Sequence, residues 1–293
     1  MTAGLYAARA RLDCVLLEKL APGGQVLTTD RVENYPGFPD GISGFELVDR
    51  MKAQAENFGL EIRSEEVMKL ELIGDRRIMT TNKGDLEAKA VILAPGAAWK
   101  RLGVDGEEAL IGKGVSYCAT CDGPFYRDQD VAVIGGGDTA MEEAIFLTRF
   151  ASNIKVIHRR DALRAIKLLQ ERAFAEEKIE FIWDTVPTKI LGGNGVEGIE
   201  LKNVKTGELS REEVQGVFIF IGTIPNTAFL RGIIELDENG FVKTDDNMQT
   251  SALGVFAAGD VRAKLFRQIS TAVGEGAAAS HAVEKYLEGL PQA

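Results

Sequence analysis

Cysteine, histidine and long apolar runs are all scarce in this chain of 293 residues. It contains three cysteines and two histidines. Three cysteines are too few for the disulfide framework of a small secreted protein. No apolar run approaches the roughly 20 residues that a membrane-spanning helix needs. The first residues also lack the charged and apolar regions of a secretory signal. We therefore expect a cytoplasmic protein that does not insert into a membrane.

Positive charge is also in short supply. Lysine and arginine number 34 against 44 aspartates and glutamates, which gives a net charge of −10. Because binding to a nucleic-acid backbone needs a basic face, this balance argues against a nucleic-acid partner. The 45% hydrophobic and 27% charged residues are typical of a globular protein. The length leaves room for two modest domains or one large one.

Alternating strands and helices predict a parallel sheet. The expected helices cover 1–11, 44–58, 138–150, 162–176 and 270–287, and the expected buried strands include 13–18, 90–94, 131–134, 155–158, 217–221 and 254–260. The order strand, helix, strand from 131 to 158 is a βαβ unit. Glycine-containing junctions near 106–114 and 222–226 flank this region. We therefore expect a middle domain inserted into an outer domain that both chain ends form.

A pair of cysteines lies at Cys118-Ala119-Thr120-Cys121, followed by Asp122. Zinc binding, two incidental cysteines and a redox-active dithiol are the three interpretations. A zinc site needs about four ligands, and the chain offers few others, so a redox pair is favoured and no metal is expected. Asp122 is a candidate proton donor, because exchange releases a thiolate that must be protonated. The alternative is that Asp122 is a plain turn residue.

A glycine-rich turn follows at Gly135-Gly136-Gly137-Asp138-Thr139-Ala140. Its Gly-x-Gly-x-x-Ala spacing, after a strand and before a helix, is typical of a turn that holds a dinucleotide pyrophosphate. Where enzymes specific for NAD usually place an acid, this chain has His158-Arg159-Arg160 and then Arg164. Guanidinium groups favour a 2′-phosphate, so the sequence predicts NADPH. A solvated basic strand end is the alternative.

A flavin commonly intervenes between a nicotinamide, which carries a hydride, and a disulfide. We therefore looked for a second dinucleotide site. Glu18 ends a strand where a ribose-binding acid is expected. Gly23-Gly24-Gln25 could approach a cofactor closely, and Gly259-Asp260 could place a carboxylate on a ribityl hydroxyl. Each also has a plain interpretation, as a surface acid or a turn.

Several motifs together resemble the bacterial low-molecular-weight thioredoxin reductases over essentially the whole chain. They are Pro22-Gly23-Gly24-Gln25, Glu33-Asn34-Tyr35-Pro36-Gly37, Cys118 to Gly123, Gly135 to Ala140, His158-Arg159-Arg160-Asp161, and Gly254 to Val261 with Arg267-Gln268. The resemblance implies an α/β fold with two Rossmann-like dinucleotide-binding domains of the three-layer ββα type, one inserted in the other. It implies an FAD-binding domain at 1–108 and 226–293, and an NADPH-binding domain with the dithiol at 109–225.

The same resemblance implies a homodimeric flavoprotein enzyme that passes electrons from NADPH through FAD and the Cys118–Cys121 pair to thioredoxin. It implies that Cys121 faces the flavin, that Asp122 is the acid, and that the NADPH domain rotates between two positions. The residues expected to bind the cofactors are Glu18, Gly23, Gly24, Gln25, Asn34, Ala94, Gly96, Gly135, Gly137, Asp138, Thr139, His158, Arg159, Arg160, Arg164, Ile221, Gly222, Gly259, Asp260, Arg267 and Gln268.

The chain departs from this pattern at its beginning. The family opens with a strand and a first Gly-x-Gly-x-x-Gly turn for the FAD pyrophosphate, whereas this sequence begins inside the following helix. We therefore expect weak FAD binding, which an absorbance spectrum of the purified protein would test. Another departure is Ala94-Pro95-Gly96-Ala97, where the family more often has threonine before the glycine. The rival functions are a reductase that serves a peroxidase, a ferredoxin–NADP reductase, and an inactive, flavin-free protein.

Overall fold

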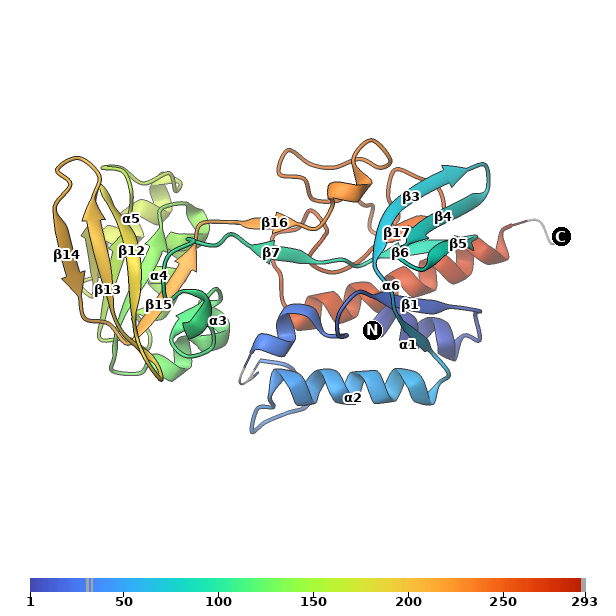
Figure 1. Cartoon of the computed structure of the whole chain (residues 1–293), viewed down its shortest axis with the longest axis horizontal. Coiled ribbons are helices and arrows are strands. Elements are labelled where there is room, and N and C mark those ends of the chain that lie inside the picture. Colours follow the sequence, from blue (N-terminus) through green and yellow to red (C-terminus); the bar gives the residue numbers. More distant parts are fainter. Residues whose placement is uncertain (30–31, 33, 291–293) are drawn as a thin grey trace. The chain divides into compact units, whose positions relative to one another are not determined.

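The computed structural model describes residues 1–29, 32 and 34–290 (Figure 1). It divides into two compact units: unit 1 comprises Met1–Ala98 and Ile224–Ala293, and unit 2 comprises Trp99–Thr223. The chain passes from one unit to the other at β7 (Ala97–Trp99) and β16 (Thr223–Pro225), which neighbour each other in a two-stranded sheet. Within the described ranges, no helix is both long and apolar enough to cross a membrane.

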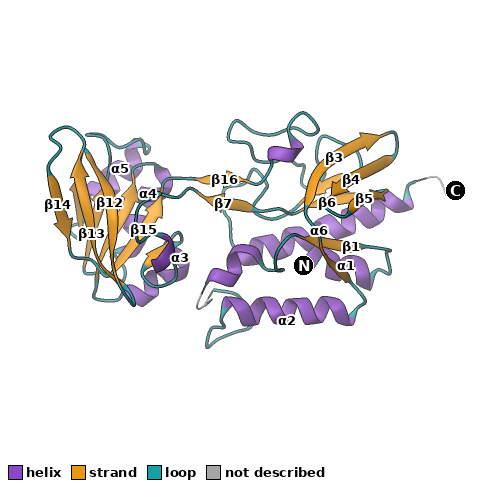
Figure 2. Cartoon of the chain, viewed as in Figure 1, coloured by secondary structure: helices purple, strands orange, loops and turns teal. Residues whose placement is uncertain are grey.

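Unit 2 is built on a parallel sheet of five strands in the order β11-β10-β9-β15-β8. Its strands are β8 (Val115–Ser116), β9 (Asp130–Gly135), β10 (Asn153–Ile157), β11 (Ile179–Ile182) and β15 (Gly216–Phe220). A second, antiparallel sheet consists of β12 (Thr185–Gly192), β13 (Val196–Asn203) and β14 (Leu209–Glu212). The α-helices are α3 (Ala119–Asp122), α4 (Asp138–Leu147) and α5 (Lys167–Ala175), which Figure 2 labels. Two 3-10 turns are η2 (Glu108–Leu110) and η3 (Gly123–Tyr126).

Unit 2 has three layers because β9 is apolar on both faces. Val131 and Val133 belong to the apolar core that includes α4 and α5. Ala132 and Ile134 belong to a second core, with side chains from β12 and β13. Successive side chains of a strand point to opposite faces of the sheet. The unbroken apolar run of β9 therefore buries the central sheet between helices and the antiparallel sheet.

Unit 1 combines small sheets with helices. Its elements are α1 (Thr2–Arg9), β1 (Val15–Glu18), η1 (Gly24–Thr28), α2 (Gly44–Asn57), β2 (Glu61–Ser64), β3 (Val67–Ile73), β4 (Arg76–Thr81), β5 (Gly84–Ala88), β6 (Val91–Leu93), η4 (Ala228–Leu230), β17 (Val255–Ala257) and α6 (Ile269–Glu288). The pairs β1–β2 and β6–β17 are parallel, and β3–β4–β5 is antiparallel. Residues alternate along β17, so that Val255 and Ala257 pack with Leu70 of β3 while Phe256 packs with Val283 of α6.

Two predicted elements differ from the structure. The strand expected to be buried at 13–18 is β1, in which Val15 is 37% exposed. Its described partner is β2, on one edge only, which leaves β1 less enclosed than a central strand. The helix expected from residue 162 begins only at Lys167. The preceding residues bond back to the glycine-rich turn instead, where Arg164 N donates to Gly136 O at 2.7 Å.

The first crossing between the units lies at Ala98–Trp99, ahead of the predicted junction at 106–114. Residues 99–108 pack inside unit 2, where Trp99 stacks on Tyr117 with ring centroids 5.9 Å apart. The buried Glu107 accepts a hydrogen bond from the Tyr117 hydroxyl at 2.6 Å. The second crossing, at Thr223–Ile224, falls within the predicted junction at 222–226. The cofactor expected in each unit stays a prediction.

Candidate functional site

The two cysteines of unit 2 form a disulfide at the start of a one-turn helix. Cys118 and Cys121 are joined, with their Cα atoms 5.3 Å apart. Cys118 is the N-cap of α3, and its Sγ accepts a hydrogen bond from Cys121 N at 3.2 Å. The two-residue spacer therefore spans one helical turn, and that turn brings the sulfurs together. Both cysteines are half-buried.

The backbone around the dithiol is held from several sides. Ser116 Oγ accepts from Cys118 N at 3.1 Å, and the carboxylate of Glu143 accepts from Ala119 N at 3.1 Å. Asp122 N donates to Cys118 O at 3.1 Å. Burial, and then the charge of Asp122, raise the pKa of the nearby Tyr126 to about 12. The disulfide thus sits in a fixed turn with a carboxylate at each end.

The glycine-rich turn connects β9 to α4, and its geometry requires glycine. Gly135 has φ of +155°, and a Cβ there would lie 2.5 Å from Phe220 O. A Cβ at Gly136 would overlap the ring of His158. Gly137 is the N-cap of α4, and the atom nearest to a Cβ built there is Arg164 Nη2, 4.0 Å away. The first two glycines permit close packing, whereas Gly137 leaves open space at the N-terminus of α4, where an anion is stabilised.

The loop that follows β10 carries three arginines. Arg159, Arg160 and Arg164 are all exposed. The loop that carries them is fixed to the turn, because Arg164 N and Ala165 N both donate to Gly136 O. A phosphate beside Gly137 would therefore meet permanently charged donors on a loop that is already positioned.

Two of the predicted nucleotide contacts also make contacts within the protein. His158 is only 5% exposed, and its Nε2 is buried without a hydrogen-bond partner. Burial lowers the pKa of His158, so its ring is neutral at pH 7 and offers no charge to a phosphate. Asp138 accepts a hydrogen bond from Ile166 N at 2.7 Å. His158 packs against the turn at Gly136 and Asp138 holds the loop at Ile166, and the roles of these residues and of the arginines at a nucleotide stay predictions.

The remaining predicted residues of unit 2 lie at exposed or connecting positions. Thr139 is exposed in the first turn of α4. Ile221 and Gly222 follow β15, and Gly222 has φ of +108°. Lys100 N donates to Gly222 O at 3.0 Å. Gly222 therefore takes part in the backbone pairing next to the crossing between the units.

In unit 1, a partly buried carboxylate follows the Gly259 turn. Asp260 Oδ1 is buried and has no hydrogen-bond partner, and its nearest cation is Lys264 Nζ at 3.5 Å. Burial raises the pKa of Asp260, and the charge of Lys264 opposes that rise. The backbone around it is fixed, since Gly259 N donates to Glu275 Oε2 at 2.7 Å. Arg262 and Lys264 pair with the other oxygen of Glu275, at 3.0 and 3.1 Å.

Arg267 and Gln268 connect this turn to α6. The Arg267 guanidinium donates to Asp260 O at 3.3 Å and lies over the Phe241 ring, 4.0 Å from its centroid. Gln268 is the N-cap of α6 and forms a capping box with Thr271. Its Oε1 accepts from Asn34 Nδ2 at 3.1 Å. The structure thus brings Asn34 and Gln268 together across 234 residues of sequence.

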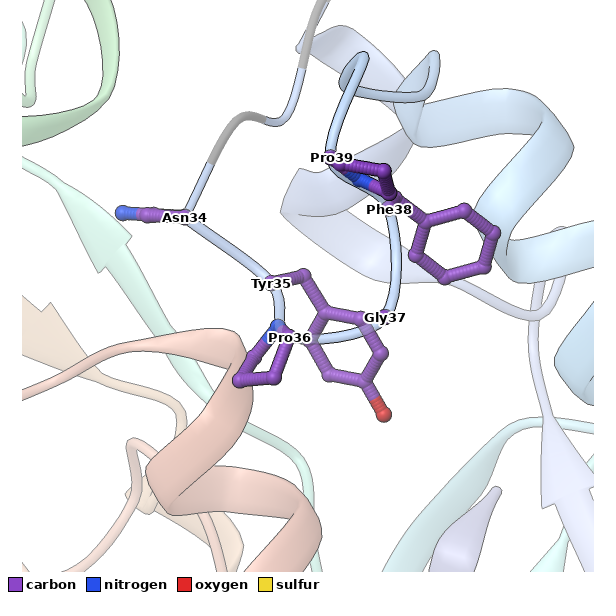
Figure 3. A pocket seen from close by; sticks show the side chains of 6 residues that line it. All are labelled: Asn34, Tyr35, Pro36, Gly37, Phe38 and Pro39. Carbon is purple, nitrogen blue, oxygen red and sulfur yellow. The ribbon is translucent and has the colours of Figure 1, made fainter.

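Asn34 directly precedes the loop Tyr35-Pro36-Gly37-Phe38-Pro39. Residues 34–39 together line an open pocket. In Figure 3 the rings of Tyr35 and Phe38 lie close together while the Asn34 amide points away from them. The two ring centroids are 6.1 Å apart. Glu33, the first residue of the predicted motif, lies outside the described residues.

The other predicted residues of unit 1 lie on two neighbouring turns and a strand end. Gln25 Nε2 donates to Ala97 O, which ties the Gly23-Gly24 turn to the segment after Gly96. Gly24 and Gly96 have φ of +54° and +71°, and a Cβ at either would meet no atom within 4 Å. Ala94 is exposed. Glu18 accepts a hydrogen bond from Leu20 N at 3.0 Å.

These residues fit a bound flavin nucleotide. The buried Asp260 oxygen needs a hydrogen-bond donor, and the hydroxyls of a ribityl chain are donors. The open faces of Gly24 and Gly96 allow a planar or charged group to approach the backbone closely. Within the part of the chain that is described, no cluster of three or more His, Cys, Asp or Glu residues is arranged to hold a metal.

The pairing of a dithiol with a dinucleotide turn agrees with comparisons to known proteins. The model of the pyridine nucleotide-disulphide oxidoreductase family matches residues 1–276. The chain belongs to this family. The thioredoxin reductase of Streptomyces coelicolor is 49% identical over 292 residues, covering 99% of this chain and 91% of that protein. The thioredoxin reductase of Mycolicibacterium smegmatis is 50% identical over 287 residues, covering 98% and 92%.

A solved structure agrees as well. The thioredoxin reductase from Streptococcus pyogenes MGAS5005 has a TM-score of 0.94 at 50% identity, covering 99% of this chain and 94% of that one. These similarities confirm the predicted resemblance to low-molecular-weight thioredoxin reductases and the two-domain dinucleotide-binding fold. They also confirm the predicted function as a thioredoxin-disulfide reductase. The individual roles assigned to site residues stay predictions.

Two residues that organise these sites were not predicted. Glu143 reaches the dithiol from α4, and Glu275 reaches the Gly259 turn from α6. The pattern around Glu143 gave no signal, because Glu142-Glu143 resembles an ordinary solvated pair. Glu275 carried a weak signal as the one acid among the small residues of 270–280.

Proposed function

We propose that this chain reduces the disulfide of thioredoxin with electrons from NADPH, using FAD held by unit 1 and the dithiol of unit 2. The observation that carries the proposal is the Cys118–Cys121 disulfide in the same unit as the open Gly137 turn and its arginines. A dithiol supplies the redox chemistry, and the turn supplies a place for the pyrophosphate. The match to the pyridine nucleotide-disulphide oxidoreductase family supports both halves of the proposal.

NADPH binding is assigned to the loop between β10 and α5. Arg159, Arg160 and Arg164 would contact the 2′-phosphate, and the backbone at Gly137 would face the pyrophosphate. His158 fills the space below Gly136 and keeps the turn in shape. These residues would bind and orient NADPH, and none of them would donate or accept a proton in the reaction.

FAD binding is assigned to unit 1. Asp260 would accept from the ribityl chain, and Arg267, Gln268 and Asn34 would surround the same region. When bound, a flavin would supply the electron-transfer chemistry that links a hydride donor to a disulfide. The chain's own part is to position Asp260, which Glu275 does by fixing the backbone of Gly259.

The dithiol performs the exchange with the protein substrate. Two electrons and two protons convert the Cys118–Cys121 disulfide into two thiols. One thiolate attacks a sulfur of the oxidised thioredoxin, forming a mixed disulfide and releasing a thiolate that takes up a proton. The second cysteine then attacks the mixed disulfide, which restores the Cys118–Cys121 bond and releases reduced thioredoxin. Asp122 directly follows Cys121 and is our candidate for the acid that protonates the leaving thiolate.

A homodimer in a reducing compartment such as the cytoplasm fits this role, on the strength of the resemblance. Analytical ultracentrifugation of the purified protein would test the oligomeric state. The main test is thioredoxin-dependent oxidation of NADPH, followed at 340 nm with added FAD. Turnover with NADPH and thioredoxin, and much slower turnover with NADH, would support the proposal. Turnover with a peroxidase partner but none with thioredoxin would overturn it.

Replacing Asp260 by alanine is expected to lower the flavin content of the purified protein. The substitution removes a buried acceptor that has no hydrogen-bond partner within the protein. We expect the dissociation constant for FAD to rise roughly 10- to 100-fold, as for loss of one hydrogen bond to a charged group. Fluorescence titration of the apoprotein with FAD measures this change.

Asp246→Ala is the matched control for this experiment, because Asp246 is an exposed acid of the same unit. It is expected to bind FAD as the unsubstituted protein does. Equal affinity in the Asp260→Ala and Asp246→Ala variants would contradict the assignment of Asp260 to the cofactor.

A further inference from the structure

The helix that carries the dithiol begins at a carboxylate from another element. The Oε2 atom of Glu143 lies 3.1 Å from Ala119 N, and the backbone N–H groups of Ala119 and Thr120 favour the charged form of this carboxyl group. Ala119 and Thr120 are the two residues between the cysteines. Glu143 therefore holds the backbone of the redox turn itself, from a helix that starts 19 residues after Ala119, at Asp138.

The position of Glu143 follows from the packing of α4. Ala140, Met141, Ala144 and Leu147 of that helix are fully buried in the core, which leaves Glu143 half-buried at the edge of the core. The dithiol helix packs closely at this edge, since a Cβ at Gly123 would lie 3.2 Å from Leu147 Cδ2. One helix thus begins at the dinucleotide turn and supports the dithiol one to two turns later.

The charge of Glu143 works against a thiolate at Cys118. The free N–H groups at the start of a helix stabilise a nearby anion and so lower the pKa of a cysteine there. Glu143 takes up the N–H groups of Ala119 and Thr120 and adds a negative charge beside them. Cys118 Sγ lies 3.2 Å from Cys121 N and 3.3 Å from Thr120 Oγ1.

The ionisation of Glu143 reflects the same surroundings. Burial raises the pKa of the Glu143 carboxyl, and the hydrogen bonds from Ala119 and Thr120 oppose that rise. The other titratable groups nearby are Glu142 on α4, Asp122 on α3 and Tyr126 on η3.

We propose that Glu143 is a positioning residue for the dithiol: its carboxylate fixes the backbone between the cysteines, and its negative charge makes the Cys118 thiol a weaker acid. The proposal rests on the proposed function only in treating Cys118 and Cys121 as the redox centre. The effect acts through Cys118, so its measurements need neither NADPH, flavin nor thioredoxin.

The test compares Glu143→Gln with Glu142→Gln in the full-length, reduced protein. Glutamine keeps the size of the side chain and one acceptor oxygen but removes the charge. Glu142 is the exposed neighbour on the same helix, so its substitution changes the net charge equally. The readout is the rate of alkylation of Cys118 by iodoacetamide between pH 6 and 9, with the modified peptide identified by mass spectrometry.

We expect Cys118 in Glu143→Gln to react about three- to tenfold faster at pH 7, with its profile shifted to lower pH, while Glu142→Gln keeps the original rate. The equilibrium with a glutathione redox buffer should shift several-fold towards the dithiol in the same variant. Unchanged alkylation in Glu143→Gln, or equal acceleration in both variants, would overturn the proposal.

Glu143→Ala separates the charge from the hydrogen bonds. Both Glu143 variants lack the charge, so both should react faster than the unsubstituted protein. Only alanine removes the acceptor, so amide hydrogen exchange at Ala119 and Thr120 should be faster in Glu143→Ala than in Glu143→Gln. Equal exchange in these two variants would contradict the positioning role, even if a variant lost reductase activity for some other reason.

Discussion

Replacing Cys121 by serine is expected to abolish the reduction of thioredoxin. The reaction needs two sulfurs, because the mixed disulfide with the substrate is resolved only when a second thiol attacks it. A serine hydroxyl cannot form that bond. The rate of thioredoxin-dependent NADPH oxidation should fall at least about a thousandfold, the order of loss seen when a catalytic nucleophile is removed. Binding of NADPH should be unchanged, because the residues proposed to hold it lie elsewhere in unit 2.

The third cysteine provides the control. Cys14 is not part of the disulfide and lies in unit 1, so Cys14→Ser makes the same chemical change away from the redox turn. Its activity should equal that of the unsubstituted protein. The Cys121→Ser variant should also form a covalent complex with oxidised thioredoxin through Cys118, visible on a non-reducing gel. Retained turnover in Cys121→Ser would show that the dithiol is not the redox centre.

The parts of the fold that follow from short stretches of sequence could be predicted. The unbroken apolar run of β9, with glycines directly after it, predicts a strand buried on both faces and a tight turn before a helix. The structure places β9 at Asp130–Gly135 and α4 from Asp138. Each of these signals lies within about ten residues, so no long-range contact is needed to recognise it. The redox pair is equally local, since one helical turn brings Cys118 and Cys121 together.

Features that depend on contacts between distant segments were not visible in the sequence. His158 follows a strand and precedes two arginines, so its residue type favours a phosphate contact. The absence of a side chain at Gly136 instead makes room for its ring, which is buried there. Asp138 resembles a phosphate-facing residue but bonds to Ile166, 28 residues away. In both cases the local pattern could not show which contacts these side chains make within the protein, and their roles at a nucleotide stay predictions.

The boundary between the units shows the same limit. Glycine-containing, charged residues at 106–114 resemble a linker, yet the segment is packed. Gly106 has φ of +86°, and a Cβ there would overlap Ile190 O, so its glycine serves close contact with β12. The chain passes between the units at Ala97–Trp99, where the sequence contains no proline and no charged residue. At the first crossing, composition alone therefore favours the glycine-containing, charged residues 106–114 over the residues where the chain passes between the units.

Replacing Arg159 and Arg160 together by alanine is expected to weaken NADPH binding selectively. Both residues are exposed, and they lie on the loop that Arg164 N and Ala165 N fix to Gly136 O. Each would form a charge-assisted hydrogen bond to a 2′-phosphate. Because a change of about 1.4 kcal/mol is tenfold in affinity, we expect the KM for NADPH to rise about 10- to 100-fold in the double variant. The kcat should change little, because neither side chain takes part in electron transfer.

The comparison with NADH makes this prediction specific to the 2′-phosphate. NADH lacks that group, so its kcat/KM should be nearly the same in the double variant and in the unsubstituted protein, and the preference for NADPH should largely disappear. Arg172→Ala is the matched control, because Arg172 is an exposed arginine of the same unit on α5. It lowers the positive charge of unit 2 without touching the turn, so its KM for NADPH should stay the same. An equal loss of kcat/KM for NADPH and NADH in the double variant would mean that the arginines hold the loop in shape and do not recognise the phosphate. In that case the 2′-phosphate would have to be recognised by another cation, and Arg164, 4.0 Å from a Cβ built on Gly137, would be the next residue to substitute.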